Sequence, residues 1–364
     1  MEITAAVLRA ADGRYALETV ELAAPGPGEL RIRIVGAGMC HTDVLPRAEG
    51  SFSPPPIITG HEGAGIVDAV GEGVTTHAVG DHVVLSFDSC GQCGNCLAGV
   101  PAYCDTFIFR NLIGRGLDGS TGVTDADGHP VSSRWFGQSS FATYAIATAR
   151  NAVVVDPSLP LEQLGPLGCG VLTGAGSVLV ALDVQAGTSI VVFGAGAVGL
   201  SAVMAAAAQG AATVIAVDLH DHRLALSLEL GATHTLRGDD PELVAKIHGL
   251  TGGGANYAFD TTGVPAVILA GLAGLRMTGT MGLVGIQTGP LVLDGTALLG
   301  KHLLSILEGG CDPQVVIPRL IAMWQEGRFP FDRLIETFPL SQINEAEQAS
   351  LSGRVIKPVL IPGS

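Results

Sequence analysis

The chain has few basic residues for its length. Nineteen lysines and arginines stand against 34 aspartates and glutamates in 364 residues, which gives a formal net charge of −15. A charge of this sign and size repels phosphate backbones and anionic lipid headgroups. The composition therefore argues against nucleic acid and membrane surfaces as partners.

The sequence also lacks the marks of a leader and of a membrane helix. The N-terminal residues MEITAAVLRAADGR have neither the basic start nor the long apolar run of a signal peptide. Residues 184–217 carry no charge, but five glycines divide this run into segments that are typical of buried parallel strands. The odd number of cysteines, seven, and their clustering fit a reducing compartment. We therefore expect a cytoplasmic protein without a membrane span.

What the chain does contain is enough apolar sequence for two domains. Hydrophobic residues make up 47% of the chain and charged residues 15%, which excludes a disordered class. Residues 1–170 are mostly β in pattern, with strict alternation at 29–34. Residues 171–307 alternate strand, glycine turn and helix, which predicts a parallel sheet. Residues 308–364 end in the strand-like RVIKPVLI and are expected to return to the first domain. The predicted fold class is α/β.

Four of the cysteines lie within fifteen residues in the pattern CxxCxxCx7C. They are Cys90, Cys93, Cys96 and Cys104. Thiolates this close can converge tetrahedrally on one zinc ion and leave no position open for substrate, so the loop 90–104 is predicted to hold a structural zinc. Unrelated thiols, two disulfides or a redox-active CxxC pair are the alternatives.

A second motif predicts a dinucleotide site. Gly194, Gly196 and Gly199 form GxGxxG between a predicted strand and a predicted helix, where backbone N–H groups can hold a pyrophosphate. Asp218 ends the next strand, 19 residues after Gly199, at the place where a carboxylate accepts hydrogen bonds from ribose hydroxyls. It would repel a 2′-phosphate, which favours NAD over NADP, although Arg223 could compensate.

Cys40, His61 and Cys169 are ordinary residues when each is taken alone. Together they offer the two sulfurs and one imidazole of a catalytic zinc site with an open fourth position. The segments around them, GMCHTD (38–43), GHEGAGIV (60–67) and LGCGVLTG (167–174), combine with the cysteine loop and GAGAVG (194–199). In this order they resemble the zinc-dependent medium-chain alcohol dehydrogenases along nearly the whole chain.

The resemblance implies a GroES-like, β-rich catalytic domain and a doubly wound Rossmann coenzyme domain. It implies a catalytic zinc on Cys40, His61 and Cys169, with Glu62 as an occasional ligand. Asp43 matches the carboxylate that orients the ligand histidine, and Thr42 matches the hydroxyl that takes the alcohol proton. The coenzyme contacts that it implies are His41 and Lys357 at the pyrophosphate, Thr173 and Val198 at the nicotinamide, and Arg223 at the adenosine ribose.

The implied activity is the reversible, NAD-dependent oxidation of primary alcohols to aldehydes, with two zinc ions per chain. Leu45 stands where many members carry a proton-relay histidine, a feature that the chain shares with benzyl and aryl-alcohol dehydrogenases. We therefore expect aromatic, allylic or terpenoid alcohols. Trp135 and Phe136 match the family's substrate-wall segment and are expected to line the pocket, with ordinary core aromatics as the alternative. The family also predicts a homodimer, formed through strands near 291–299, or a homotetramer. A thiol-adduct formaldehyde dehydrogenase and an inactive NAD-binding protein are the alternatives.

Overall fold

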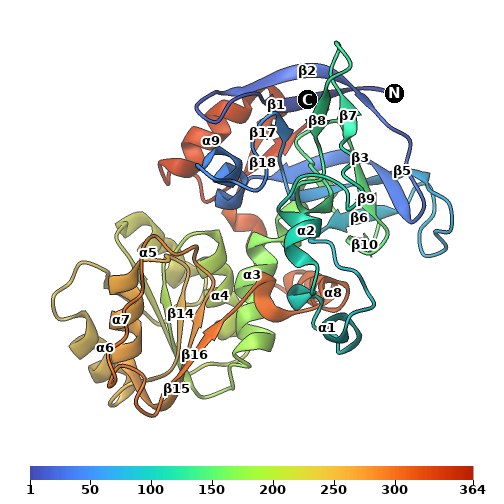
Figure 1. Ribbon diagram of the computed structural model, residues 1–364. Coiled ribbons are helices and arrows are strands. Elements are labelled where there is room, and N and C mark those ends of the chain that lie inside the picture. The colour runs from blue at the N-terminus through green and yellow to red at the C-terminus, as the bar shows by residue number, and fades with distance from the viewer. Residues whose placement is uncertain (364) are drawn as a thin grey trace. The chain divides into compact units, whose positions relative to one another are not determined.

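The computed structural model describes residues 1–363, which form two compact units (Figure 1). Unit 1 comprises residues 1–170, 312–318 and 332–363, and unit 2 comprises residues 171–311 and 319–331. Residues 308–311 and 319–331 thus belong to unit 2, whereas the sequence pattern assigns them to the first domain. A hydrogen bond from Arg319 NH2 to Gln209 Oε1, at 3.2 Å, joins the second of these segments to unit 2.

Unit 1 is built from β-strands. A closed barrel contains β1 (Glu2–Leu8), β2 (Tyr15–Leu22), β7 (Gly122–Thr124), β8 (Pro130–Ser132) and β4 (Ile57–Ile58). A seven-stranded sheet has the order β10 (Ala152–Val155), β6 (His82–Leu85), β5 (Glu62–Val70), β3 (Glu29–Gly38), β18 (Lys357–Ile361) and β17 (Ile335–Pro339), with β9 (Tyr144–Thr148) paired to β3. Its short helices are α1 (Gly94–Leu97), α2 (Phe107–Asn111) and α9 (Ile343–Leu351).

Strand β3 shows how sequence alternation places the site in unit 1. Its buried residues Leu30, Ile32 and Ile34 alternate with Arg31 and Arg33, which are less buried, because successive side chains of a strand point to opposite faces. The strand ends at Gly38, which pairs with Glu62 at the start of antiparallel β5. The chain segments that follow β3 and precede β5 are thereby brought together.

Unit 2 is a doubly wound α/β unit. Its six parallel strands have the order β13 (His234–Arg237), β12 (Thr213–Asp218), β11 (Ser189–Phe193), β14 (Ala255–Asp260), β15 (Leu275–Leu283) and β16 (His302–Ser305). The helices of this unit are α3 (Gly170–Gly176), α4 (Ala197–Ala208), α5 (Asp221–Glu229), α6 (Leu243–Thr251) and α7 (Pro265–Gly274), and α8 (Pro313–Gln325) is shared with unit 1. The order reverses direction at β11, and ligands of such sheets bind at the carboxyl ends of the strands near that point.

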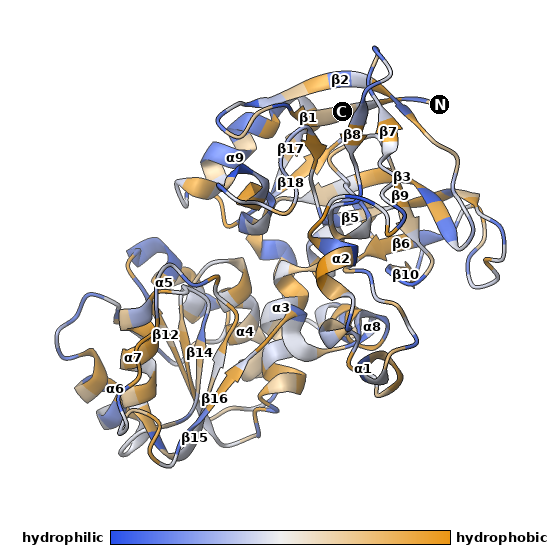
Figure 2. Ribbon diagram, viewed as in Figure 1, coloured by the Kyte–Doolittle hydropathy of each residue, from blue (hydrophilic) through white to orange (hydrophobic). Residues whose placement is uncertain are grey.

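The uncharged run 184–217 contains two central strands of this sheet, β11 and most of β12, and the helix α4 between them. Strand β11 is buried along its whole length, and β12 is buried from Val214 onward. In Figure 2, strand β12 is drawn largely in orange, the colour of hydrophobic residues. No helix within residues 1–363 is long and apolar enough to cross a membrane. Burial on both faces of a parallel sheet therefore accounts for the apolar run.

The segment 291–299 forms no strand in the single chain. It consists of irregular backbone and turns, and β16 begins only at His302. The expected strand is therefore absent at these positions of the isolated subunit. A strand that pairs with a second copy has no hydrogen-bonding partner in one chain.

Candidate active site

Four side chains from separate parts of unit 1 converge. Cys40 follows β3, His61 and Glu62 stand at the start of β5, and Cys169 directly precedes α3. One potential ligand atom from each of these residues lies within 4.8 Å of the others. His61, Glu62 and Cys169 are buried, and Cys40 is half-buried. The fold thus gathers every residue that the sequence assigns to the catalytic metal.

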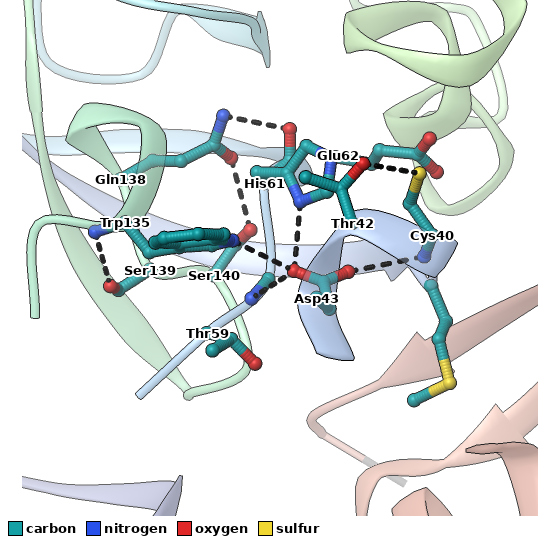
Figure 3. Close-up of polar contacts among 12 residues, drawn as sticks. Cys40, Thr42, Asp43, Thr59, His61, Glu62, Trp135, Gln138, Ser139 and Ser140 are labelled. Atoms are coloured by element: carbon teal, nitrogen blue, oxygen red, sulfur yellow. Dashed lines mark hydrogen bonds and ion pairs between the residues drawn. The ribbon is translucent and has the colours of Figure 1, made fainter. Parts of the chain in front are cut away.

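The Asp43 carboxylate fixes the orientation of His61 (Figure 3). Its Oδ1 accepts hydrogen bonds from His61 Nδ1 at 2.8 Å, from the Gly60 backbone N–H at 2.9 Å and from Trp135 Nε1 at 3.2 Å. Its Oδ2 accepts the Cys40 backbone N–H at 3.1 Å. With Nδ1 held as the donor, Nε2 is left to act as an electron-pair donor, which is the arrangement that metal-binding histidines use.

His61 Nε2 is buried and has no hydrogen-bond partner within residues 1–363. Burying a polar atom without a partner is costly, so this nitrogen needs a ligand. Burial opposes protonation of the ring, but Asp43 raises the pKa of His61 well above its usual value. A hydrogen bond with Cys169 and the positive charge of Lys357 lower the pKa of Cys40. A carboxylate-oriented imidazole beside a favoured thiolate fits zinc.

Glu62 is already engaged by a buried lysine. Lys357 Nζ donates to both carboxylate oxygens at 2.8 Å, and the Gly170 backbone N–H donates to Oε1 at 2.8 Å. Burial lowers the pKa of Lys357, but the Glu62 charge outweighs this and raises it above its usual value. With Glu62 neutralised in this way, the metal donors that remain are two sulfurs and one imidazole. Lys357 is 2% exposed, and its predicted pyrophosphate contact stays a prediction.

The four-cysteine loop gathers its sulfurs as a metal would require. Cys90, Cys93, Cys96 and Cys104 lie within 4.8 Å of one another and form no disulfide. Cys90 Sγ and Cys96 Sγ are 3.9 Å apart, close to the roughly 3.8 Å edge of a tetrahedron of sulfurs around zinc. Two backbone N–H groups, those of Gln92 and Cys93, donate to Cys90 Sγ.

The thiols of this loop do not ionise independently. A backbone N–H of Asp105 lowers the pKa of Cys93 to about 6. Burial, followed by the neighbouring Cys93 sulfur, raises the pKa of Cys96 to about 12. Negative charge on one sulfur therefore opposes ionisation of the next. A bound divalent cation removes that conflict, so the sulfur set fits a structural zinc.

The predicted glycine motif forms the turn between β11 and α4. Gly194 has a φ of 91°, and a Cβ at Gly199 would lie 1.7 Å from the Gly194 carbonyl oxygen. These two glycines are required by the turn itself. Gly196 precedes the first residue of α4 and has no atom within 4 Å of the place where its Cβ would be. That open space lets a phosphate approach the backbone N–H groups of the helix start.

Asp218 ends β12 beside this turn. Its carboxylate accepts the backbone N–H of Ala195 at 2.7 Å and that of His220 at 2.9 Å. Arg223 NH1 lies 3.9 Å from Asp218 Oδ2, and its buried Nε has no hydrogen-bond partner within residues 1–363. Together with Gly194 and Gly196, both residues line a hollow of about 580 Å³ in unit 2. Its size and its polar groups fit the adenosine half of a dinucleotide.

The other predicted residues lie in different surroundings. His41 is exposed, and Thr42 Oγ1 lies 3.7 Å from Cys40 Sγ. Thr173, in α3, is 9% exposed, and Val198, in the first turn of α4, is half-buried. Leu45 is half-buried within the turn that follows Cys40.

Trp135 and Phe136 are buried beside His61. The Phe136 ring stacks on the His61 ring with centroids 4.5 Å apart, while the Trp135 indole N–H is bound to Asp43. Their predicted place in a substrate pocket stays a prediction.

Gln138 supports the site but was not identified from the sequence. Its Nε2 donates to the His61 carbonyl at 2.9 Å, and its Oε1 accepts the Gly63 N–H at 3.0 Å. It thus ties together the backbone on both sides of Glu62. Only its place in the polar segment GQSS, next to the predicted pocket residues, could have drawn attention to it.

Comparisons with known proteins give one answer along the whole chain. Residues 26–157 match the alcohol dehydrogenase GroES-like domain, and residues 197–311 match the zinc-binding dehydrogenase family. A geraniol dehydrogenase of Castellaniella defragrans is 48% identical over 98% of this chain and 97% of its own. A probable alcohol dehydrogenase of a Pseudomonas species is 40% identical over 74% of this chain and 88% of its own.

Two solved structures have nearly the same fold. An alcohol dehydrogenase zinc-binding domain protein from Burkholderia ambifaria has a TM-score of 0.96 and 47% identity, with 99% of both chains covered. A benzyl alcohol dehydrogenase from Acinetobacter calcoaceticus has a TM-score of 0.95 and 41% identity, again over 99% of both chains. The predicted α/β fold, with a GroES-like part and a Rossmann part, is confirmed.

Proposed function

Because the chain belongs to the zinc-dependent, NAD-linked alcohol dehydrogenases, we propose that it oxidises terpenoid, allylic or aromatic primary alcohols to aldehydes. The observation that carries the activity is the buried, unpartnered His61 Nε2, which is oriented by Asp43 and lies beside two cysteine sulfurs. The substrate class is supported by the geraniol and benzyl alcohol dehydrogenases among the similar proteins.

Each residue of the site has a defined task in this reaction. Cys40, His61 and Cys169 would hold a zinc ion, which when bound supplies a Lewis acid that makes the alcohol hydroxyl more acidic. Asp43 keeps His61 Nδ1 protonated and its ring fixed. Thr42, whose hydroxyl lies 3.7 Å from Cys40 Sγ, would accept a hydrogen bond from the alcohol hydroxyl and pass its own proton on to water as the alcohol loses its proton. A nicotinamide coenzyme bound in unit 2 would supply the hydride acceptor.

The polar contacts behind the site keep its charges balanced. Lys357 holds the Glu62 carboxylate at 2.8 Å, so that this negative charge does not add to those of the two thiolates. Apolar and aromatic side chains, among them Phe136 on the His61 ring, keep water from the imidazole. A dry site strengthens the electrostatic interactions on which proton loss from the alcohol depends.

Initial-rate measurements test the proposal. Geraniol, cinnamyl alcohol, benzyl alcohol and ethanol are compared by kcat/KM with NAD and with NADP. We expect geraniol, cinnamyl alcohol and benzyl alcohol to be preferred over ethanol, and NAD over NADP because of Asp218. A preference for ethanol contradicts the substrate class. Turnover of formaldehyde only when glutathione is present would identify the thiol-adduct reaction instead.

We also propose two zinc ions per chain, one on Cys40, His61 and Cys169 and one on the four-cysteine loop, and a homodimer or homotetramer that works in the cytoplasm. The two cysteine-containing groups of donor atoms support this count, whereas the third group of possible donors, Asp125, Asp127 and His129, lies largely exposed and has no sulfur. Exposed apolar residues in and beside the segment 291–299, among them Val292 and Leu299, support association. Metal analysis of the purified protein measures the number of zinc ions per chain, and sedimentation measures the number of chains per oligomer.

A further inference from the structure

Glu308 is an acidic residue in an unusual position in unit 2. It is 9% exposed and has a φ of 49°, a left-handed conformation that side-chain-bearing residues seldom adopt. Its Oε2 accepts a hydrogen bond from the Thr173 hydroxyl at 3.4 Å. A buried carboxyl group on a strained backbone is costly, and such positions concentrate at functional sites.

Close packing fixes the loop that carries Glu308 against α3. A Cβ at Gly309 would lie 2.8 Å from the Leu172 carbonyl oxygen, and a Cβ at Gly176 would lie 2.8 Å from Cys311 Sγ. The two backbones touch at these glycines, so neither segment can shift alone. The backbone of Glu308 is therefore held in place, and its carboxylate is held by the hydrogen bond from Thr173.

Helix α3 also contacts the turn that would bind the pyrophosphate. A Cβ at Gly174 would lie 2.0 Å from the carbonyl oxygen of Val198, which belongs to the first turn of α4. Thr173 is the neighbour of Gly174 and the partner of Glu308. A short series of contacts thus joins the Glu308 carboxylate to the glycine motif.

The strand order tells which half of the coenzyme lies near Glu308. Asp218 and β12 lie on one side of β11, and β14, β15 and β16 lie on the other. A dinucleotide with its adenosine at Asp218 and its pyrophosphate at the start of α4 must extend toward β14–β16 along the carboxyl ends of the strands. Glu308 follows the end of β16, Ser305, by three residues.

We propose that the Glu308 carboxylate faces the nicotinamide end of the bound coenzyme and favours the oxidised, positively charged ring over the reduced, neutral ring. The inference rests on the proposed function, because it requires that NAD binds in unit 2. Opposite charges a few ångströms apart in a partly buried site attract strongly, whereas a neutral ring gains nothing comparable.

The test measures NAD⁺ and NADH binding separately by calorimetry on the full chain. In Glu308→Gln we expect the affinity for NAD⁺ to fall about tenfold and that for NADH to change by less than about threefold. Glu308→Gly should give the same shift in the ratio, because glycine suits the left-handed backbone while it removes the carboxylate. Glu308→Asp keeps the charge, and aspartate tolerates this conformation, so its ratio should stay near that of the unchanged chain.

Glu242→Gln is the matched control, since it removes one negative charge from an exposed position of the same unit. It should leave both affinities unchanged. Equal losses for NAD⁺ and NADH in the Gln and Gly variants, or no change in either, would overturn the inference and leave Glu308 as a structural partner of Thr173. If the unchanged chain binds neither coenzyme form, the proposed function fails instead.

Discussion

A single carboxylate organises the surroundings of His61. Asp43 accepts four hydrogen bonds, two from backbone N–H groups, one from the imidazole and one from the Trp135 indole. The fourth of these bonds gives Trp135 a positioning role toward the metal site that does not depend on contact with substrate. Mutation of a residue that hydrogen-bonds to a metal ligand, or that holds such a residue in place, commonly lowers the metal affinity by about 10–100-fold.

Trp135→Phe should therefore weaken zinc binding at the catalytic site on the order of tenfold while the ring volume is largely kept. Zinc affinity is measured by competition with a chromogenic chelator. Trp324→Phe is the control, because the chain has two tryptophans and the second packs against Phe331 in unit 2. Equal zinc affinities in the two variants would show that the indole hydrogen bond does not position His61.

The pair Glu62 and Lys357 predicts a stability effect. Both residues are at most 2% exposed and are joined by two hydrogen bonds of 2.8 Å. Lys357→Met leaves a buried carboxylate without its cation and should lower the free energy of unfolding by about 3–5 kcal/mol. Urea denaturation of the metal-free protein measures it.

The double variant Lys357→Met with Glu62→Gln tests the cause. It removes both charges and should recover most of the lost stability, since the penalty comes from the unpaired charge rather than from the missing contact. A double variant as unstable as the single one would mean that the lysine acts through packing.

The turn between β11 and α4 depends on how closely its two ends approach. Gly199 lies in the first turn of α4, and its Cα faces the carbonyl oxygen of Gly194, the first residue after β11. The hydrogen bond from the Gly194 N–H to the Val217 carbonyl ties the same turn to β12. Turn, helix and second strand are thus one rigid element on which a pyrophosphate would be placed.

Gly199→Ala should disrupt this element, because the added Cβ would lie 1.7 Å from the Gly194 oxygen and backbone has to move. We expect a loss of about 1–3 kcal/mol of stability, as for other overpacked positions, together with loss of coenzyme binding. Thermal unfolding and calorimetry with NAD measure the two effects.

Gly249→Ala in α6 is the matched control. It has no atom within 4 Å of the new Cβ and lies inside a helix, so it should stabilise the protein by about 0.5–1 kcal/mol. A loss of stability there as large as that of Gly199→Ala would mean that the close approach to Gly194 is not the cause.

Across the whole chain, the two groups of donors that we propose as zinc sites would have different tasks. The four-cysteine set leaves no donor position open, whereas Cys40, His61 and Cys169 provide three donors, with Glu62 bound to Lys357. A closed site contributes to folding and an open one to chemistry. Experiments can distinguish the two tasks, because the donors of one group can be mutated without changing those of the other.

Cys93→Ser and Cys169→Ser should each reduce the zinc content from two ions per chain to one. We expect Cys93→Ser to lower the unfolding temperature strongly, since a structural zinc contributes folding energy, and Cys169→Ser to abolish turnover with a smaller loss of stability. Elemental analysis and thermal scans check both. Full turnover in Cys169→Ser would contradict the assignment of the catalytic metal.

Much of this molecule follows from local sequence. Short-range rules predict the alternation of β3 and the buried runs of β11 and β12, because side chains of a strand alternate between its faces. The glycine turn before α4 is predictable as well, because only glycine leaves enough space there. Metal donors are also recognisable, because sulfur and imidazole have few other reasons to occur at such spacing. The enzyme class is confirmed by the family matches.

Tertiary structure alone decided which partners the polar residues have. Trp135, expected in a substrate wall, donates to Asp43, and Lys357 is paired with Glu62, 295 residues away in sequence. No sequence motif identified Glu308, and its position beside Thr173 depends on a strained loop that packs on α3. Periodicity and spacing describe neighbours along the chain, whereas these contacts join distant segments whose approach is set by the packing of the whole core.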